Sequence, residues 1–189
     1  MGRSKPLLPL GDKPVICHCL AALHAAVDRP VVVLGPGGEA IAEILAGQTI
    51  DFAWNRKEGA DMADSIRIGL EMVPAHVSGV LVAQADYPLL RPATIDCLVS
   101  RHRKRPERIL LPCYKGRCGH PPLLPRRIIE EIRNEPTLRE VVQRDMDRLE
   151  RVTVDDAGIL QDMDTPDDYR HVRNLYMLNA QNDCRPDIP

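Results

Sequence analysis

The chain has 189 residues, of which 44% are hydrophobic, and this length suits one domain with a full hydrophobic core. Its 25 Lys and Arg residues nearly balance its 27 Asp and Glu residues and only 3% of residues are aromatic, so it lacks the basic surface or stacking platform of a nucleic-acid binder. Because no apolar run approaches the roughly 20 residues that cross a bilayer and no signal-peptide pattern opens the chain, we expect a cytoplasmic protein with neither a nucleic-acid nor a membrane partner.

The first half of the chain alternates helical and strand patterns. Apolar residues at helical spacing predict a helix over residues 14–27. Residues 31–34 form a short, continuous apolar run rich in β-branched side chains, which is typical of a strand covered on both faces. A Gly-Pro-Gly-Gly turn, a short helix and a strand over residues 50–54 follow. Asp61 is placed to cap a helix over residues 62–73.

The second half continues the alternation. Residues 79–85, GVLVAQA, predict a buried strand that ends at Asp86, and Pro92 suits the first position of a helix that reaches about residue 102. The remaining expected elements are a strand over 109–111, helices over 125–134 and 137–145, a strand over 149–154 and a helix over 166–177. We expect residues 178–189, which are polar and contain two prolines, to be a flexible tail outside a single domain of residues 1–177.

This alternation predicts a fold class. Strands and helices of these lengths predict an α/β fold, a three-layer α/β/α sandwich with a mostly parallel sheet. In such sheets ligands bind at the carboxyl ends of the strands, so polar residues that directly follow strands are the candidates for function. One feature is unusual: the chain opens with a loop and a helix, whereas a doubly wound fold normally opens with its central strand.

The six cysteines allow more than one interpretation. A chain with a sufficient core and no export signal is expected to keep free thiols. Cys113 and Cys118 flank a Gly-containing loop, and they would need two further ligands to hold zinc. Cys17 and Cys19 diverge on the expected helix, which disfavours a shared metal.

Two residues stand out as candidates for phosphate and metal chemistry. Lys5 follows small residues and precedes an apolar segment, a pattern that suits a phosphate-binding loop, although a lysine near a terminus can also be merely solvated. Asp86 follows a predicted buried strand directly, where a carboxylate can hold a Mg²⁺ ion that bridges nucleotide phosphates. The alternative for Asp86 is the cap of a turn.

Three further segments combine polar residues with glycine or with helix starts. Residues 116–122, GRCGHPP, suggest close approach of the backbone to a ligand, or an ordinary turn. In DMDTPDDY the Asp-Thr-Pro part suits a helix start, yet Asp162 and Asp164 add carboxylates that capping does not require. Residues 59–65, GADMADS, run into a helix N-terminus that offers unpaired N–H groups.

The order of these segments resembles that of a known family. MGRSKPLLPLGDKPV, WNRKEGADMADSIRIGL, LVAQADYPLL, CYKGRCGHPPLL and DMDTPDDY resemble the MobA-like NTP transferases over residues 1 to about 172, and they look closest to the molybdenum cofactor cytidylyltransferase branch. The resemblance implies a nucleotide-diphospho-sugar-transferase-like variant of the Rossmann fold. The family begins with a strand and a Gly-rich loop directly before the first of these motifs, so we expect that strand and most of that loop to be missing here.

The resemblance also implies catalytic residues. Lys5 matches the lysine that grips the nucleotide phosphates, and Asp86 and Asp164 match the residues that hold Mg²⁺, the expected cofactor. All three are therefore expected to act in catalysis. Two positions depart from the family pattern, because Tyr87 stands where Gln is usual and Met163 stands where Ile is common.

Two further sets of residues are implied for binding. The segment that lies along the base and ribose in related cytidylyltransferases corresponds to Gly59, Ala60 and Ser65. The loop that would face the acceptor corresponds to Gly119, His120 and Pro121.

The implied activity is Mg²⁺-dependent transfer of a cytidylyl group from CTP to the phosphate of molybdopterin, the molybdenum cofactor, with release of pyrophosphate. CTP or GTP and a molybdopterin-type acceptor are the expected small-molecule partners, and a molybdoenzyme apoprotein is a further one. The alternatives are a guanylyltransferase that uses GTP, transfer to a different phosphorylated acceptor, or a non-catalytic accessory protein that hands the cofactor to a molybdoenzyme.

Overall fold

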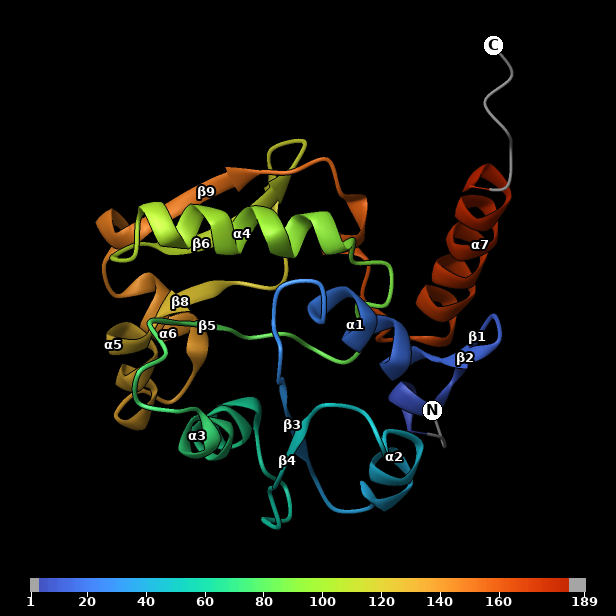
Figure 1. Cartoon of the computed structure of the whole chain (residues 1–189), viewed down its shortest axis with the longest axis horizontal. Coiled ribbons are helices and arrows are strands. Elements are labelled where there is room, and N and C mark those ends of the chain that lie inside the picture. Colours follow the sequence, from blue (N-terminus) through green and yellow to red (C-terminus); the bar gives the residue numbers. More distant parts are fainter. Residues whose placement is uncertain (1–3, 184–189) are drawn as a thin grey trace.

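The computed structural model describes residues 4–183 of the chain (Figure 1). Two parts lie outside the described residues: residues 1–3 of the N-terminal motif, and residues 184–189 of the expected tail, which include Cys184.

The elements of the first half are the 3-10 turn η1 (Lys5–Leu7), β1 (Pro9–Leu10), β2 (Lys13–Pro14), α1 (Val15–Leu23), β3 (Val31–Leu34), α2 (Glu39–Ile44), β4 (Asp51–Trp54), α3 (Met62–Met72) and β5 (Gly79–Leu81). Strands β3 and β4 and helix α3 follow the sequence prediction closely, whereas α1 ends at Leu23 rather than at residue 27, and η1, β1 and β2 were not predicted. Asp61 caps α3 as expected, because its side chain accepts a hydrogen bond from the Asp64 backbone N–H at 2.8 Å, and the Asp64 side chain accepts one from the Asp61 N–H at 3.3 Å.

The second half contains α4 (Pro92–Lys104), β6 (Ile109–Tyr114), β7 (Arg117–Cys118), β8 (Leu123–Pro125), α5 (Arg126–Ile129), η2 (Glu130–Arg133), α6 (Leu138–Gln143), η3 (Met146–Arg148), β9 (Leu149–Thr153), η4 (Ala157–Leu160) and α7 (Pro166–Asp183). Helix α7 continues to Asp183, so the expected end of this helix at residue 177 is wrong. No proline or glycine interrupts the chain between Pro166 and Pro186, and nothing local therefore ends the helix at Met177. None of the helices within residues 4–183 is long and apolar enough to span a membrane.

Helices cover both faces of a central sheet, which confirms the expected three-layer α/β/α arrangement. Leu110 of β6 and Leu123 of β8 pack into a core with residues of α1 and α4. Their neighbours Ile109 and Leu124 point to the opposite face and pack with residues of α3, α5 and α6. This alternation is the period-2 pattern of a sheet buried on both sides. Figure 1 shows α4 lying along β6 and β9.

The sheet is mixed, where the sequence predicted a mostly parallel one. Its strand order is β5-β8-β6-β7, and β9 also pairs with β6. The pairs β6–β9 and β3–β4 are parallel, whereas β8 runs antiparallel to both β5 and β6. Strand β8 is a three-residue apolar segment, LLP, that follows two prolines; it is too short to show a period, and no strand was predicted there.

A gap separates two strands that the sequence predicted to be buried. Strands β3 and β4 form a two-stranded sheet of their own, and β5 ends at Leu81 where the sequence predicted a strand as far as residue 85. A cavity of about 890 Å³, which we call the strand slot, lies between residues 31–33 and residues 79–85. Val32 and Val80 are therefore only half-buried, and the expectation that both strands are covered on both faces is wrong.

The β6–β7 hairpin contains a disulfide. Cys113 and Cys118 are register partners in this antiparallel pair, with Cα atoms 3.9 Å apart, and their sulfurs are bonded. The expectation of free thiols is wrong for this pair, because hairpin register brings together two cysteines that the sequence shows only as flanking a turn. Cys17, Cys19 and Cys97 are free thiols.

Candidate active site

Three segments that are far apart in the sequence meet at the carboxyl end of β5. Asp86 lies in the loop that follows β5, Lys5 lies in η1, and Asp164 lies in the loop before α7. Lys5 Nζ donates to Asp164 Oδ1 at 2.8 Å, across 159 positions of sequence. Both residues also act electrostatically on Asp86. The structure thus brings together the three residues expected to act in catalysis.

Packing of the N-terminal segment against α1 and α7 holds Lys5 in this position. The β1–β2 hairpin buries Leu10 completely against Val15, Met163 and Val172. The Tyr169 hydroxyl of α7 donates to the Pro9 carbonyl at 2.6 Å. The β1–β2 hairpin and the start of α7 are therefore fixed to each other, which places Lys5 beside the loop that carries Asp164.

Asp164 is available to pair with Lys5 because Thr165 and Asp168, rather than Asp164, cap the start of α7. The Thr165 backbone N–H donates to Asp168 Oδ2 at 2.7 Å, and the Asp168 N–H donates to Thr165 Oγ1 at 3.2 Å. Met163 on the other side is fully buried, which explains how this position tolerates Met. The side chain of Asp164 remains 68% exposed and is paired with Lys5.

Asp86 is a half-buried carboxylate that lies among like charges. Its Oδ1 atom is buried and has no hydrogen-bond partner within residues 4–183. Burial raises the pKa of Asp86 and the carboxylates of Asp164 and Asp162 raise it further, while a hydrogen bond with its own backbone and the charge of Lys5 oppose the shift. The pKa of Lys5 is raised in turn, chiefly by its hydrogen bond to Asp164. A carboxylate in this state favours the approach of a cation.

The loop after β7 brings His120 to the same edge. The Gly119 N–H donates to the Pro112 carbonyl and the His120 N–H to the Ile159 carbonyl, each at 2.9 Å. A Cβ atom on Gly119 would collide with the Ile159 backbone, so this position requires glycine for packing. Pro121 is buried. Of the three residues expected to face an acceptor, Gly119 and Pro121 serve packing, and His120 is the one whose side chain lies beside Tyr87 at this edge.

His120 packs against Tyr87, the residue that follows Asp86. Their ring centroids are 5.0 Å apart, and His120 Nδ1 is buried without a hydrogen-bond partner among the described residues. Burial lowers the pKa of His120, and the carboxylates of Asp86 and Asp162 only partly offset this effect. Burial and the nearby carboxylates raise the pKa of Tyr87 to about 12. Both rings are therefore uncharged at neutral pH.

The segment expected to bind the nucleotide lies at the N-terminus of α3. Gly59 has a φ of +68°, and a Cβ atom there would meet no atom within 4 Å, so the space over it is open. Ala60 is half-buried in the same turn. The Ser65 hydroxyl accepts from the buried Asn55 amide at 3.3 Å and donates to the Asp61 carbonyl at 3.4 Å.

One contact links the segment at the start of α3 to the loop that carries Asp86. Gln84 Nε2 lies 3.7 Å from Met62 Sδ, which connects the loop after β5 to the first turn of α3. No hydrogen bond or ion pair among residues 4–183 joins Gly59, Ala60 or Ser65 to Lys5 or Asp86. The structure therefore forms two neighbouring parts, one with Lys5, Asp86, Asp164 and His120, the other at the start of α3.

Two residues of the site were not assigned roles from the sequence. Asp162 raises the pKa of both Asp86 and Tyr87, and the DMDTP pattern already indicated it as a spare carboxylate. Cys19 of α1 is buried beside the Tyr87 backbone, and burial raises the pKa of its thiol to about 12. No sequence signal identifies Cys19, because its position is apolar in the helical pattern.

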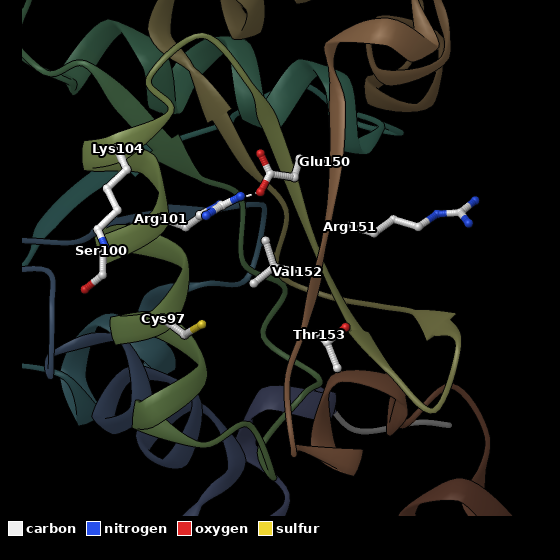
Figure 2. Close-up of a pocket in the computed structure, with 8 residues that line it drawn as sticks. All are labelled: Cys97, Ser100, Arg101, Lys104, Glu150, Arg151, Val152 and Thr153. Atoms are coloured by element: carbon white, nitrogen blue, oxygen red, sulfur yellow. Dashed lines mark hydrogen bonds and ion pairs between the residues drawn. The ribbon is translucent and has the colours of Figure 1, made fainter.

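A second cleft lies away from these residues. It has a volume of about 400 Å³ between α4 and β9 and is lined by Cys97, Ser100, Arg101, Lys104, Glu150, Arg151, Val152 and Thr153. Figure 2 shows that Arg101 is paired with Glu150 across the cleft and that Arg151 points away from α4. None of the residues singled out from the sequence for function lines this cleft.

Comparison with known sequences places the chain near nucleotide-using enzymes. Residues 1–152 match the family model described as the MobA-like NTP transferase domain. The bifunctional protein GlmU of Thermus thermophilus is 38% identical over 101 residues, which cover 53% of this chain and 22% of that protein. The chain thus spans about a fifth of the length of the curated relatives it matches.

Solved structures confirm the fold. The complex of Rv0371c from Mycobacterium tuberculosis H37Rv with manganese has a TM-score of 0.78 and 25% identity, and the match covers 92% of this chain and 94% of that one. A nucleotidyl transferase from Methanothermobacter thermautotroptrophicus (Mth528) has a TM-score of 0.77 and 20% identity, over 93% of this chain and 86% of that one.

Proposed function

Because the chain belongs to the MobA-like NTP transferase family, we propose that it transfers a nucleotidyl group from a nucleoside triphosphate to a phosphorylated acceptor. In this reaction a phosphate oxygen of the acceptor attacks the α-phosphorus of the nucleotide. A new P–O–P linkage forms, the bond from the α-phosphorus to the oxygen bridging to the β-phosphate breaks, and pyrophosphate leaves with the bonding electrons. The protein needs to position the reactants and offset their charge, and it needs no covalent nucleophile.

The observation that carries this proposal is the meeting of Lys5, Asp86 and Asp164 at the carboxyl end of β5. This is the edge at which open α/β sheets bind their ligands. The three side chains come from the beginning, the middle and the end of the chain, and no helix cap or core contact explains why Asp86 holds a buried, unpaired oxygen there.

Lys5 is suited to bind the phosphates. Its hydrogen bond to Asp164 raises its pKa, so the ammonium group is fully charged at neutral pH. The ion pair with Asp164 is partly exposed and hence weak, which lets Lys5 exchange this partner for a phosphate oxygen. In that position Lys5 offsets the charge that builds up on the leaving pyrophosphate.

The carboxylates at this edge fit a divalent cation. Within residues 4–183 no group of three or more His, Cys, Asp or Glu side chains forms a metal cage. Mg²⁺ typically needs only one or two carboxylates, with water and substrate phosphates as its other ligands. Asp86, with its unpaired oxygen, and Asp164 would hold it. When bound, Mg²⁺ offsets the charge of the nucleotide phosphates, and the manganese complex of Rv0371c supports metal use in a relative.

The remaining expected residues divide between nucleotide and acceptor. The open space over Gly59 and the half-buried Ala60 and Ser65 suit the base and ribose at the start of α3. His120, uncharged and packed on Tyr87, suits contact with the acceptor. Gly119 and Pro121 shape the loop and hold His120 in place.

At finer detail we propose CTP as the nucleotide and the phosphate of a molybdopterin-type molecule as the acceptor, on the resemblance of the GHP and DTP segments to the cytidylyl branch. A second candidate is transfer to a different phosphorylated acceptor. The identity of 38% to GlmU over 101 residues favours this candidate. The same experiment also tests two further hypotheses, the use of GTP and a non-catalytic role in handing the cofactor to a molybdoenzyme.

Pyrophosphate release tests the proposal. The chain is incubated with Mg²⁺ and, in turn, CTP, GTP, UTP or ATP, each with molybdopterin or with a panel of sugar 1-phosphates, and nucleotide binding is followed by thermal shift. We expect Asp86→Asn to reduce pyrophosphate release at least about 100-fold. Asp96→Asn, on the exposed side of α4, is the matched control and should leave the rate unchanged.

Each result distinguishes the candidates. Turnover with CTP and molybdopterin supports the finer proposal, turnover with GTP and molybdopterin supports the use of GTP, and turnover only with a sugar phosphate replaces the finer proposal with the second candidate. Nucleotide binding without pyrophosphate release with any acceptor supports the accessory role. Full activity of Asp86→Asn contradicts the role proposed for Asp86 in holding the cation.

A further inference from the structure

The short turn η4 lies between two loops of the proposed active site. On one side it touches the loop that carries Asp86, because a Cβ atom on Gly158 would collide with the backbone carbonyl of Leu89. On the other side the Ile159 carbonyl accepts a hydrogen bond from the His120 N–H at 2.9 Å. The backbone of η4 is therefore in direct contact with both loops, and its position affects both.

One buried carboxylate fixes η4 in this place. Asp156 directly precedes η4, is only 2% exposed, and accepts from the Gly158 N–H at 2.8 Å through its Oδ1 atom. Its Oδ2 atom accepts from the Arg91 N–H at 2.9 Å and from the Thr94 hydroxyl at 2.6 Å. Arg91 ends the loop that carries Asp86, and Thr94 lies in the first turn of α4. Asp156 therefore ties η4 to the end of that loop.

The three bonds to Asp156 all come from uncharged donors. Within residues 4–183 two backbone N–H groups and one hydroxyl hold this carboxylate, and no Lys, Arg or His side chain pairs with it. A buried carboxylate that loses such a donor is left partly unsatisfied, which is costly in the absence of water. The attachment of η4 therefore depends on both carboxylate oxygens.

The two loops that η4 touches carry the two aromatic rings of the site. Tyr87 lies in the same loop as Arg91, and the His120 backbone is bonded to η4. The two ring centroids are 5.0 Å apart, and His120 Nδ1 has no hydrogen-bond partner among residues 4–183. The placement of the His120 ring against Tyr87 therefore depends on the backbones that Asp156 ties together.

From this arrangement we propose that Asp156 is a positioning residue, which sets the contact between His120 and Tyr87 by holding η4 against both loops. Its carboxylate is buried, so it acts only through these loops. Asp164 is held separately, by its ion pair with Lys5. The consequence for acceptor binding rests on the proposed function, whereas the placement of the rings does not.

Asp156→Asn tests the placement of the rings. The amide keeps the shape of the side chain but replaces one acceptor oxygen by a donor, so at least one of the three bonds is lost. The ring resonances of His120 are assigned by their absence in His120→Gln, and Tyr87→Leu shows where they lie without the neighbouring ring. At pH 8, where histidine is uncharged, we expect Asp156→Asn to shift the His120 resonances toward their positions in Tyr87→Leu.

A milder variant and a control for stability accompany this experiment. Thr94→Val removes one donor to Asp156 and should shift the same resonances in the same direction by a smaller amount. It provides the test if Asp156→Asn does not fold, as judged by circular dichroism. Val141→Ala lies in the core on the opposite face of the sheet from Ile159. It should lower the urea midpoint and leave the His120 resonances at their parent positions.

Kinetics test the consequence for the acceptor in the same proteins. With an acceptor that supports pyrophosphate release, Asp156→Asn should raise the KM for that acceptor at least about tenfold. The Kd of the nucleotide, measured by thermal-shift titration, should stay at the parent value. If the parent chain turns over no acceptor, the proposed function fails, and the His120 resonances alone test the role of Asp156.

Three results would overturn the proposal. His120 resonances that stay at their parent positions in folded Asp156→Asn and Thr94→Val show that the loops hold the ring without Asp156. A shift of equal size in Val141→Ala assigns the effect to lost stability. An equal rise in the acceptor KM and the nucleotide Kd in Asp156→Asn identifies a general disturbance of the site.

Discussion

At the scale of single residues, Asp86 and its neighbouring carboxylates are unfavourable for the stability of the fold but favourable for binding a cation. Asp86 buries an oxygen without a partner and lies among the like charges of Asp162 and Asp164. A site that waits for phosphates and a cation must keep such groups unsatisfied when it is empty. These unsatisfied groups lower the free energy of unfolding, and the pH dependence of that free energy measures the effect.

The stability of Asp86→Asn should depend on pH in a specific direction. Burial, with the neighbouring carboxylates, raises the pKa of Asp86 in the folded state, so the folded chain holds the proton more tightly than the unfolded chain. The stability from this group is present below the unfolded pKa, about 3.9, and is lost as pH rises through the raised folded pKa. Asn does not ionise, and we expect the variant to be more stable than the parent at pH 7.

Urea denaturation at pH 7 and at pH 4 checks this prediction. The difference between Asp86→Asn and the parent should shrink at the lower pH, and Asp96→Asn should show no difference at either. A variant that is less stable than the parent at pH 7 would mean that Asp86 forms a stabilising contact.

His120 should give a dependence of the opposite sign. Burial lowers the pKa of His120, so below the unfolded pKa of about 6.5 the unfolded chain binds more protons than the folded chain. Stability is therefore present above that pH and is lost as pH falls through it toward the lowered folded pKa. His120→Gln should make the fall in stability between pH 7 and pH 5 shallower.

Equilibrium unfolding at half-unit steps of pH measures this slope. The slope should not vanish, because burial also lowers the pKa of His102 and contributes with the same sign. His76→Gln, at an exposed loop position, is the control and should keep the parent slope. An unchanged slope in His120→Gln would show that this histidine protonates as readily in the folded chain as in the unfolded one.

At the scale of elements, helix starts in this chain follow from local sequence. The Asp61 cap of α3 was predicted from the sequence and is confirmed, because a capping residue acts on N–H groups within three positions of itself. Capping boxes also begin α6 at Thr137 and α7 at Thr165. The latter orients the loop that presents Asp164.

Thr165→Ala should therefore affect both stability and the site. Loss of the cap should cost about 1 kcal/mol of stability, and the freed loop should weaken the pairing of Asp164 with Lys5 and reduce nucleotide binding. Thr137→Ala removes the same kind of cap from α6 and should cost a similar amount with no change in binding. Denaturation midpoints and a nucleotide thermal-shift titration separate the two effects. Equal loss of binding in both variants would show that global stability alone is responsible.

Short strands, by contrast, were not predicted. Strand β7 has two residues and β8 has three, and neither length can show a period of two against its surroundings. Strand β8 exists because its residues pair with β5 on one side and β6 on the other. The early end of β5 has the complementary cause, since residues beyond Leu81 lack a strand on the side of the slot.

At the scale of the whole molecule, the two sheets should differ in how easily they open. Strands β3 and β4 form a two-stranded sheet with no ladder to the other strands of residues 4–183, and a two-stranded unit is only marginally stable by itself. Strands β6 and β9 pair over five positions inside the larger sheet. We expect amides of β3 and β4 to exchange at least about tenfold faster than those of β6 and β9 under native conditions.

Native-state hydrogen exchange with residue resolution measures this difference in the 189-residue chain. Uniform protection over both sheets would mean that the chain opens as one cooperative unit across the strand slot. The comparison uses amides within strands only, so that loop exchange does not enter.

The sequence by itself determined the elements with local causes and the chemical type of the site. Helical periodicity, caps and continuous apolar runs act over a few residues, and they predicted α3, α4, β3 and β9 nearly to their ends and α1 at its start. The motifs, and the family resemblance they carry, singled out Lys5, Asp86 and Asp164. Only the tertiary structure decided what depends on pairing and packing: the antiparallel insertion of β8, the strand slot, the disulfide of the β6–β7 hairpin, and the placing of Cys19 and Asp162 near Asp86. These features arise from pairing and packing that no local pattern encodes, because most of the residues involved lie tens of positions apart.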